Sequence, residues 1–325
     1  MASKILVVHN PKAGTGQIRL DDYLKALEAR GAAATLRTLS ENFNLKDALA
    51  DASNFERVVV AGGDGTASAA ATILQNSEIP IVIYPAGTAN LLALNLKMPS
   101  AADDLAEVTV NGPWLPVDLG RLDYKIYRRR DYFRTRFGLK TRPDFLTAHF
   151  ILMAGSGFVA SLVSQAEPLK GRFGKAAYWW SAFFGRHPRV ALFKLNIDGQ
   201  PIRARGIGAL VVNFEKLHFD LKVVPDSNPQ DGAFEVVLLK AKNIYEFFQA
   251  LRILIAERLG FKRPEKLKEA DFFRGSEIEV SSWPPLKLEF DGEPLPKVNF
   301  FKVTALPRSV HLVFGSSADL PAKKT

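Results

Sequence analysis

An apolar run that ends in a glycine-rich turn and leads into a helix constrains the fold of this chain most strongly. Residues 57–61 read Arg-Val-Val-Val-Ala, residues 62–66 read Gly-Gly-Asp-Gly-Thr, and an alanine-rich segment continues to Gln75. This pattern predicts a turn between the carboxyl end of a strand and the amino end of a helix. Free backbone N–H groups and the helix dipole favour an anion there, and glycine permits a phosphate to approach the backbone closely. A tight turn without a ligand is the alternative interpretation.

Two further loops follow apolar runs in the same way. The segment Asn-Pro-Lys-Ala-Gly-Thr-Gly begins at Asn10, and its glycines, including Gly14, free backbone donors while Asn10 braces the turn. The Gly spacing matches neither a P-loop nor a dinucleotide fingerprint. The segment Pro-Ala-Gly-Thr-Ala-Asn ends at Asn90, and we expect Gly87, Thr88 and Asn90 to form another wall of a nucleotide site. Helix capping by Thr88 or Asn90 is the alternative.

The first 120 residues alternate strand and helix patterns. The expected strands cover residues 4–9, 34–39, 57–61 and 79–84, and the expected helices cover 17–30, 45–52 and 66–75. Helices between strands imply right-handed crossovers and a doubly wound parallel sheet, in which ligands gather at the carboxyl ends of the strands. All three loops occupy such ends.

After about Val117 the pattern changes to short alternating runs separated by Asp-Gly turns, which predicts an antiparallel β-rich region. Two helices are expected within it, at 174–184 and 244–259. The runs cover 145–152, 191–197, 208–213, 233–239, 277–280, 287–290 and 300–304. The predicted fold class is therefore α/β plus β. The last apolar run, 309–314, fits either part.

Composition excludes several classes of protein. The length of 325 residues suits two domains. The absence of cysteine excludes disulfides, thiolate nucleophiles and Cys-based metal sites, and it fits a cytoplasmic protein. Residues 145–166 lack Asp, Glu, Lys and Arg and are long enough to span a bilayer. His149, the Gly155–Gly157 interruption and several polar residues instead favour a strand up to about Met153, a glycine turn and a short helix.

Positive charge is concentrated in residues 124–142, which we call the basic segment. It holds eight Lys or Arg against Asp131 alone, and thus +7 of the net charge of +9, with five Tyr or Phe interleaved. This composition suits an anionic membrane surface. Phosphate backbones of nucleic acid and a merely solvated loop are the alternatives, and we expect no nucleic-acid partner.

The three loops, in this order, resemble the diacylglycerol kinase catalytic superfamily, which also includes sphingosine and ceramide kinases. Gly155-Ser156-Gly157-Phe158 and Asp291-Gly292-Glu293 resemble two later motifs of the same family, so the resemblance covers nearly the whole chain. It implies an ATP-binding α/β domain, residues 1–120 plus about 306–325, and a β-rich lipid domain, residues 121–305.

The resemblance also implies site residues. Thr88 lines the ATP phosphates together with the run after the third strand, Thr38 reaches the nucleotide, and Glu293 matches the proton acceptor. Asp231, with the backbone carbonyls of Asn228 and Ala233, matches a structural Mg²⁺ site. The phosphate-lining run is Gly62, Gly63, Asp64, Gly65, Thr66, Ala67 and Ser68.

These residue types suit phosphoryl transfer to a lipid hydroxyl. A carboxylate such as Glu293 can take the hydroxyl proton, while alignment and Mg²⁺ supply most of the rate, with Asp64 organising the metal. A plain hairpin turn is the alternative for residues 291–293. Two positions depart from the family pattern: Val159 and Gln230 stand where relatives commonly carry an acid, and the second departure lowers the expected metal affinity.

The sequence therefore predicts an ATP-dependent lipid kinase, peripheral on the cytoplasmic face of a membrane. Diacylglycerol, ceramide, a sphingoid base and phosphatidylglycerol all remain candidate substrates, because acyl pockets have no distinctive pattern. The competing functions are a kinase for a soluble alcohol and a non-catalytic lipid-binding regulator. The oligomeric state is open.

Overall fold

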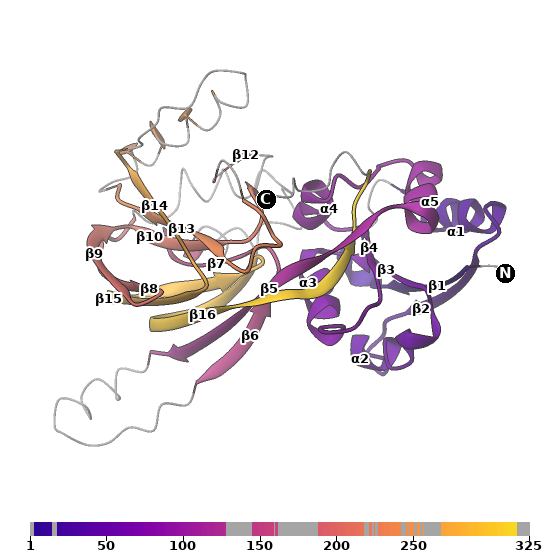
Figure 1. Ribbon diagram of the computed structural model, residues 1–325, viewed down its shortest axis with the longest axis horizontal. Coiled ribbons are helices and arrows are strands. Elements are labelled where there is room, and N and C mark those ends of the chain that lie inside the picture. The colour runs from indigo at the N-terminus through magenta and orange to yellow at the C-terminus, as the bar shows by residue number, and fades with distance from the viewer. Residues whose placement is uncertain are drawn as a thin grey trace.

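The computed structural model describes residues 3–14, 18–127, 145–158, 160–161, 188–217, 221–222, 224, 227–241, 245–246, 248–249, 252–253, 256 and 268–316. Two lobes lie side by side, and long strands run from one to the other (Figure 1). The predicted class, α/β followed by antiparallel β, is confirmed.

The first lobe contains a parallel sheet in the order β4-β3-β1-β2. Helices bury both faces of β1, β3 and β4, which explains why these strands read as nearly continuous apolar runs, whereas the edge strand β2 is mostly exposed. Helices α1 and α5 pack on one face, against Val7, Val59 and Val82, whereas α2, α3 and α4 pack on the other. The elements are β1 (Lys4–His9), η1 (Pro11–Ala13), α1 (Leu20–Ala29), β2 (Ala33–Thr38), α2 (Leu45–Ala48), η2 (Ala52–Asn54), β3 (Arg57–Gly62), α3 (Asp64–Ile73), β4 (Ile81–Pro85), α4 (Leu91–Asn95) and α5 (Ala102–Asn111).

The second lobe is built from antiparallel strands around a separate apolar core that includes Phe193, Phe234 and Phe301. Buried and exposed positions alternate along β8, as expected for a strand with one face on that core. The strands are β5 (Trp114–Ile126), β6 (Leu146–Phe150), β7 (Met153–Gly157), β8 (Ala191–Ile197), β9 (Gln200–Gly206), β10 (Gly208–Val212), β11 (Lys216–Leu217), β12 (Leu221–Lys222), β13 (Phe234–Leu239), β14 (Ala270–Gly275), β15 (Glu277–Phe290) and β16 (Glu293–Val313).

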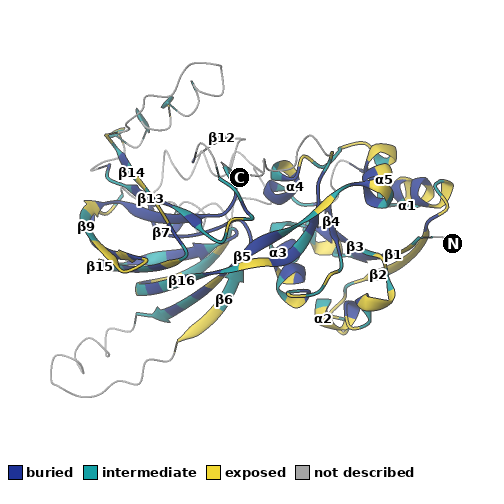
Figure 2. Ribbon diagram, viewed as in Figure 1, coloured by how far each residue is buried: buried dark blue, intermediate teal, exposed yellow. Residues whose placement is uncertain are grey.

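Strands β5 and β16 join the lobes, because they pair with each other from the β-rich lobe into the first lobe. The far end of β16 also lies beside the parallel sheet, where Leu312 pairs with Ile81 of β4. Buried residues lie on both strands on either side of the junction, whereas Pro307 and Arg308 of β16 are exposed between them (Figure 2). The two lobes are therefore held by continuous backbone pairing rather than by a flexible linker.

Several element boundaries differ from those expected. Helix α3 begins at Asp64 rather than Thr66, α2 ends at Ala48 before a short 3₁₀ turn, and the runs 277–280 and 287–290 belong to one strand, β15. The expected helix at 174–184 falls outside the described residues, as does much of the one at 244–259.

The predicted glycine turn at Gly155–Gly157 is wrong. These residues form β7, where glycine is needed because backbone packs closely on it: a Cβ on Gly157 would clash with the carbonyl of Ile207, and one on Gly155 would lie 3.2 Å from the carbonyl oxygen of Ala209. Among the described residues, no helix is long and apolar enough to cross a membrane.

Candidate active site

The three glycine-bearing loops meet at the carboxyl edge of the parallel sheet. Asn10 donates from Nδ2 to the hydroxyl of Thr66 at 2.9 Å, which joins the loop after β1 to α3. A Cβ on Gly87 would lie 2.7 Å from the Cα of Gly63, and one on Gly14 would lie 3.4 Å from the carbonyl oxygen of Ala86. Backbone therefore approaches backbone at these contacts, and a larger residue at position 87 would separate the loops.

A pocket of ≈ 400 Å³ lies over the loops after β1 and β3. Asn10, Gly63, Gly65 and Thr66 line it from the first lobe, and Glu293 lines it from the second. A neighbouring pocket of ≈ 570 Å³ is lined by Gly14, Gly87, Thr88 and Asn90, among others, and the two pockets share Ala13. The predicted residues thus line adjoining spaces at one sheet edge.

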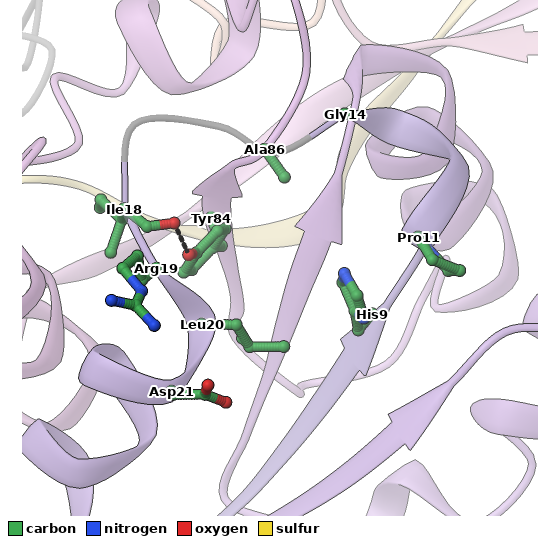
Figure 3. A pocket seen from close by; sticks show the side chains of 9 residues that line it. All are labelled: His9, Pro11, Gly14, Ile18, Arg19, Leu20, Asp21, Tyr84 and Ala86. Carbon is green, nitrogen blue, oxygen red and sulfur yellow. Dashed lines mark hydrogen bonds between the residues drawn. The ribbon is translucent and has the colours of Figure 1, made fainter.

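A third pocket, of ≈ 340 Å³, lies on the other side of the first loop (Figure 3). The hydroxyl of Tyr84 donates to the carbonyl oxygen of Ile18 at 2.6 Å and so holds the residues before α1 against β4. His9 and Arg19 also line this pocket. It shares Gly14 and Ala86 with the pocket around Thr88, so the loop after β1 is bordered by space on both sides.

Asp64 stands in the first turn of α3, and its carboxylate spans two helices. Its Oδ1 accepts a hydrogen bond of 3.0 Å from the backbone N–H of Leu92, in the first turn of α4. Asn90, the residue before α4, has left-handed backbone and makes no side-chain cap of its own, so Asp64 supplies the cap from another helix. Asp64 therefore fixes the loop after β4 relative to α3 as well as standing beside the pocket.

Glu293 approaches α3 from the β-rich lobe. It follows the Asp291-Gly292 turn between β15 and β16, and its Oε1 lies 2.8 Å from the point that a Cβ on Gly65 would occupy. Glycine at position 65 therefore leaves room for this carboxylate at the start of the helix. The contact brings a carboxylate of the second lobe to the first turn of α3, where the backbone N–H groups of the helix start are exposed to the pocket side.

Asp291 is buried and cross-links the lobes. Its carboxylate accepts from the backbone N–H groups of Ile151, Leu152 and Met153 at 2.7–2.9 Å, and from the hydroxyl of Ser68 on α3. Burial raises the pKa of Asp291 from 3.8 to about 6, even though all of these donors favour the ionised form. The turn that presents Glu293 is therefore held against α3 by its first residue.

Two family models match this chain. The diacylglycerol kinase catalytic domain matches residues 4–122, and the YegS C-terminal NAD kinase beta sandwich-like domain matches residues 153–314. The chain belongs to the diacylglycerol kinase catalytic-domain family of lipid kinases. The predicted resemblance is thus confirmed over both lobes.

Curated relatives match this lipid kinase along most of its length. The probable lipid kinase YegS-like of Yersinia enterocolitica is 24% identical, covering 95% of this chain and 96% of the relative. The diacylglycerol kinase of Staphylococcus aureus (strain MRSA252) is 25% identical, covering 90% and 87%. A crystal structure of a putative diacylglycerol kinase from Bacillus anthracis str. Sterne has the same fold, with a TM-score of 0.73 at 20% identity, and covers 98% of this chain and 99% of that one.

Not every predicted ligand of the kinase lines the pockets. Ala67 and Ser68 are buried, and the Ser68 hydroxyl is bonded to Asp291 rather than directed to the pocket. Gly62 packs against Thr66, where a Cβ would lie 2.7 Å from that of Thr66. Thr38 ends β2 in an exposed position, next to the pocket-lining Leu39. Asn90, by contrast, lines the pocket around Thr88, and it also accepts from the backbone N–H of Gly87 at 2.7 Å and so shapes its own loop.

The predicted Mg²⁺ ligands lie in the turn before β13, away from these pockets. The carboxylate of Asp231 is paired with the guanidinium of Arg274 on β14 and accepts from the N–H of Ala233 at 3.3 Å, while the side chain of Asn228 accepts from the N–H of Gln230. A positive charge thus already neutralises Asp231. Over the described residues no group of three or more His, Asp or Glu side chains is arranged to hold a metal ion. The carboxylate of Asp231 is therefore paired with a cation of the chain itself, and its role as a metal ligand with the carbonyls of Asn228 and Ala233 stays a prediction.

Beside the same turn, Asp118 of β5 is fully buried and forms hydrogen bonds with both the turn and β16. It accepts from the N–H groups of Gly232 and Arg308 at 2.7 and 2.8 Å, and burial is the main cause that raises its pKa. Its role is to hold the turn to β16.

Sequence reasoning missed the apolar side of the main pocket. Leu39, Leu45, Ala13 and Ala69 line it opposite the polar groups. Leu39 and Leu45 flank a loop that follows β2, so the rule that ligands gather at the carboxyl ends of parallel strands was the available signal.

Proposed function

We propose that this protein transfers the γ-phosphoryl group of ATP to the hydroxyl of a membrane lipid, with a diacylglycerol-like lipid as the favoured substrate. The observation that carries the proposal is the contact of Glu293 with Gly65, which puts a carboxylate from one lobe at the first turn of a helix in the other. The names of the Yersinia and Staphylococcus relatives support a lipid as acceptor.

The start of α3 is suited to hold the phosphates. The residue that precedes the helix is Gly63, which has no side chain to cap the N–H groups of the first turn. These groups and the helix dipole then attract an anion, and Thr88 and Gly14 border the adjoining space. The apolar wall of Leu39 and Leu45 offers a surface for the base of the nucleotide.

Glu293 would take the proton of the lipid hydroxyl. As that proton moves to the carboxylate, the lipid oxygen forms a bond to the γ-phosphorus and the bond to the β-phosphate oxygen breaks, releasing ADP. Mg²⁺ would arrive with ATP and neutralise charge on its phosphates. Asp64 stands at the same helix start, where a carboxylate can help to orient the nucleotide-bound metal.

The substrate class is tested with γ-labelled ATP and Mg²⁺, offering the full chain diacylglycerol, ceramide, a sphingoid base or phosphatidylglycerol in micelles, and glycerol and sugars in solution. Label in a lipid product, lost in Glu293→Gln, supports the proposal. Label only in a soluble alcohol would identify the alternative kinase, and no transfer to any acceptor would favour a non-catalytic lipid-binding protein.

We also propose that the kinase acts on the cytoplasmic face of a membrane as a peripheral protein. The charge of the basic segment supports this proposal. Reversing four of its arginines between positions 128 and 136 should weaken sedimentation with anionic vesicles, and the binding of wild type should fall with added salt.

A further inference from the structure

One outward face of the β-rich lobe combines cations with apolar side chains, of which Leu192 and Trp283 are exposed and Phe300 is partly buried. We call it the distal face and define it by Lys194, Arg203, Arg205, Leu192, Trp283 and Phe300. It lies on β8, β9, β15 and β16, and β8, β9 and β15 gather at the end of the molecule farthest from α1 and α5 (Figure 1). All of these residues belong to the described part of the chain, outside the 128–142 stretch.

Strand register places the six residues together. Leu192 pairs with Arg205 on one side and Trp283 on the other, and Lys194 pairs with Arg203 and Ser281. Ser281 in turn pairs with Phe300. Their neighbours along the strands, including Phe193 and Phe301, are buried in the core, so the six side chains share the opposite, outward face.

The side chains of the distal face lower the stability of the isolated protein. Trp283 is 51% exposed and Leu192 is 43% exposed, on directly opposed positions. Lys194 and Arg203 are also opposed, and like charges directly across an antiparallel pair are destabilising. A partner that is both anionic and apolar would offset both costs.

The face continues toward the start of the basic segment. Phe300 pairs with Lys125, and its ring packs edge-on against that of Phe145 with the centroids 5.9 Å apart. Phe145 is itself 48% exposed. The next outward-facing positions along β15 and β5, away from Trp283, are acidic. They are Glu279, which pairs with Asn196, and Asp123, which pairs with Lys302. The net charge of the distal face around Trp283 is therefore positive.

We propose that the distal face docks on an anionic lipid bilayer. Tryptophan and phenylalanine seat in the headgroup region while Lys and Arg attract anionic headgroups, which matches the mixture on these strands. The inference rests on the proposed lipid-kinase function. Strand β15 runs from Trp283 directly to the turn that carries Glu293, so docking here would fix the catalytic turn relative to the membrane.

The test measures sedimentation of the full chain with phosphatidylcholine vesicles that contain about one third phosphatidylserine. Lys194→Glu should weaken binding about tenfold, because it removes one positive charge near the bilayer and adds a negative one. The matched control is Lys25→Glu, an exposed residue of α1 with the same change of charge, which should bind as wild type does. Trp283→Ala should weaken binding as well, whereas Trp114→Ala, 43% exposed in the other lobe, should not.

A second readout separates docking from folding. Lys194→Glu creates an opposite-charge pair with Arg203, so its melting temperature should stay the same or rise while vesicle binding falls. Equal binding of wild type, Lys194→Glu and Trp283→Ala would overturn the proposal. A change from dimer to monomer in the two variants by analytical ultracentrifugation would also overturn it and assign the face to a second copy of the chain.

Phosphorylation of a short-chain diacylglycerol dispersed as monomers keeps the two proposals apart. The docking variants should retain this activity. If wild type bound vesicles through this face but phosphorylated no lipid, the kinase function would fail and the docking surface would stand.

Discussion

The carboxylate of Glu293 occupies the space that any side chain at Gly65 would need. Its Oε1 lies 2.8 Å from the ideal Cβ position of residue 65, although the two residues come from different lobes. The glycine in the Gly-Gly-Asp-Gly-Thr turn therefore makes room for a side chain of the second lobe, in addition to the phosphate-binding role proposed for this turn.

If Glu293 takes the substrate proton as proposed, Gly65→Ala should reduce kcat about tenfold, because the added Cβ displaces the Glu293 carboxylate. Stability should not fall, because Gly65 lies in α3 and alanine favours a helix by about 0.5–1 kcal/mol over glycine. Steady-state kinetics and thermal unfolding of both single variants and of Gly65→Ala/Glu293→Gln measure the effect. The double variant should be no slower than Glu293→Gln alone; strictly additive losses would show that Gly65 acts independently of Glu293.

Substitutions of Asp64 should separate its structural contact from its chemical role. Asp64→Asn keeps an oxygen that can accept from the N–H of Leu92, so its melting temperature should stay close to that of wild type while activity is lost. Asp64→Ala should lose activity and also about 1 kcal/mol of unfolding free energy, as expected for a lost helix cap. Chemical denaturation beside a labelled-ATP assay makes the comparison. An active Asp64→Asn would confine this residue to holding α4.

Asp291 should make stability depend on pH in mildly acidic solution. Burial raises its pKa from 3.8 to about 6, so between these values the folded state holds a proton that the unfolded state has released. The contribution of Asp291 is therefore fully present at low pH and is lost as pH rises to about 6, by about 2–3 kcal/mol in total.

Asp291→Asn cannot titrate, so it isolates this contribution. Urea unfolding should show the free-energy difference, wild type minus variant, falling as pH increases from about 4 to about 6.5. Parallel pH profiles for the two proteins would contradict the raised pKa.

The meeting of the loops could be predicted from the sequence, because parallel strands bring their carboxyl ends to one edge whatever the details of packing. The cross-link by Asp291 could not. Ser68 and Asp291 lie 223 residues apart, and their contact depends on how the two lobes pack. Likewise, Gly155 and Gly157 were read as a turn because glycine commonly marks one, whereas here it permits close packing of β7 on β10.

The Asp231 turn shows a different limit. Position alone predicted Asp231 as a metal ligand, and the sequence could not show that Arg274 pairs with it. The guanidinium reaches the turn because β13 pairs with β14, which sets Glu235 opposite Arg274. A motif of candidate ligand residues does not reveal that a basic side chain from another strand pairs with one of them.

Removal of divalent cations should therefore leave the fold unchanged. Without nucleotide, the melting temperature of wild type should be the same in EDTA and in excess Mg²⁺, because Arg274 already compensates Asp231. Arg274→Ala should melt about 2 °C lower, as expected for a partly exposed ion pair, and should regain stability when Mg²⁺ is added. Lys302→Ala breaks an exposed pair with Glu277 elsewhere and should gain no response to Mg²⁺, which makes it the matched control. A wild-type protein that loses stability in EDTA would instead show that a metal ion binds this chain and that Arg274 does not replace it.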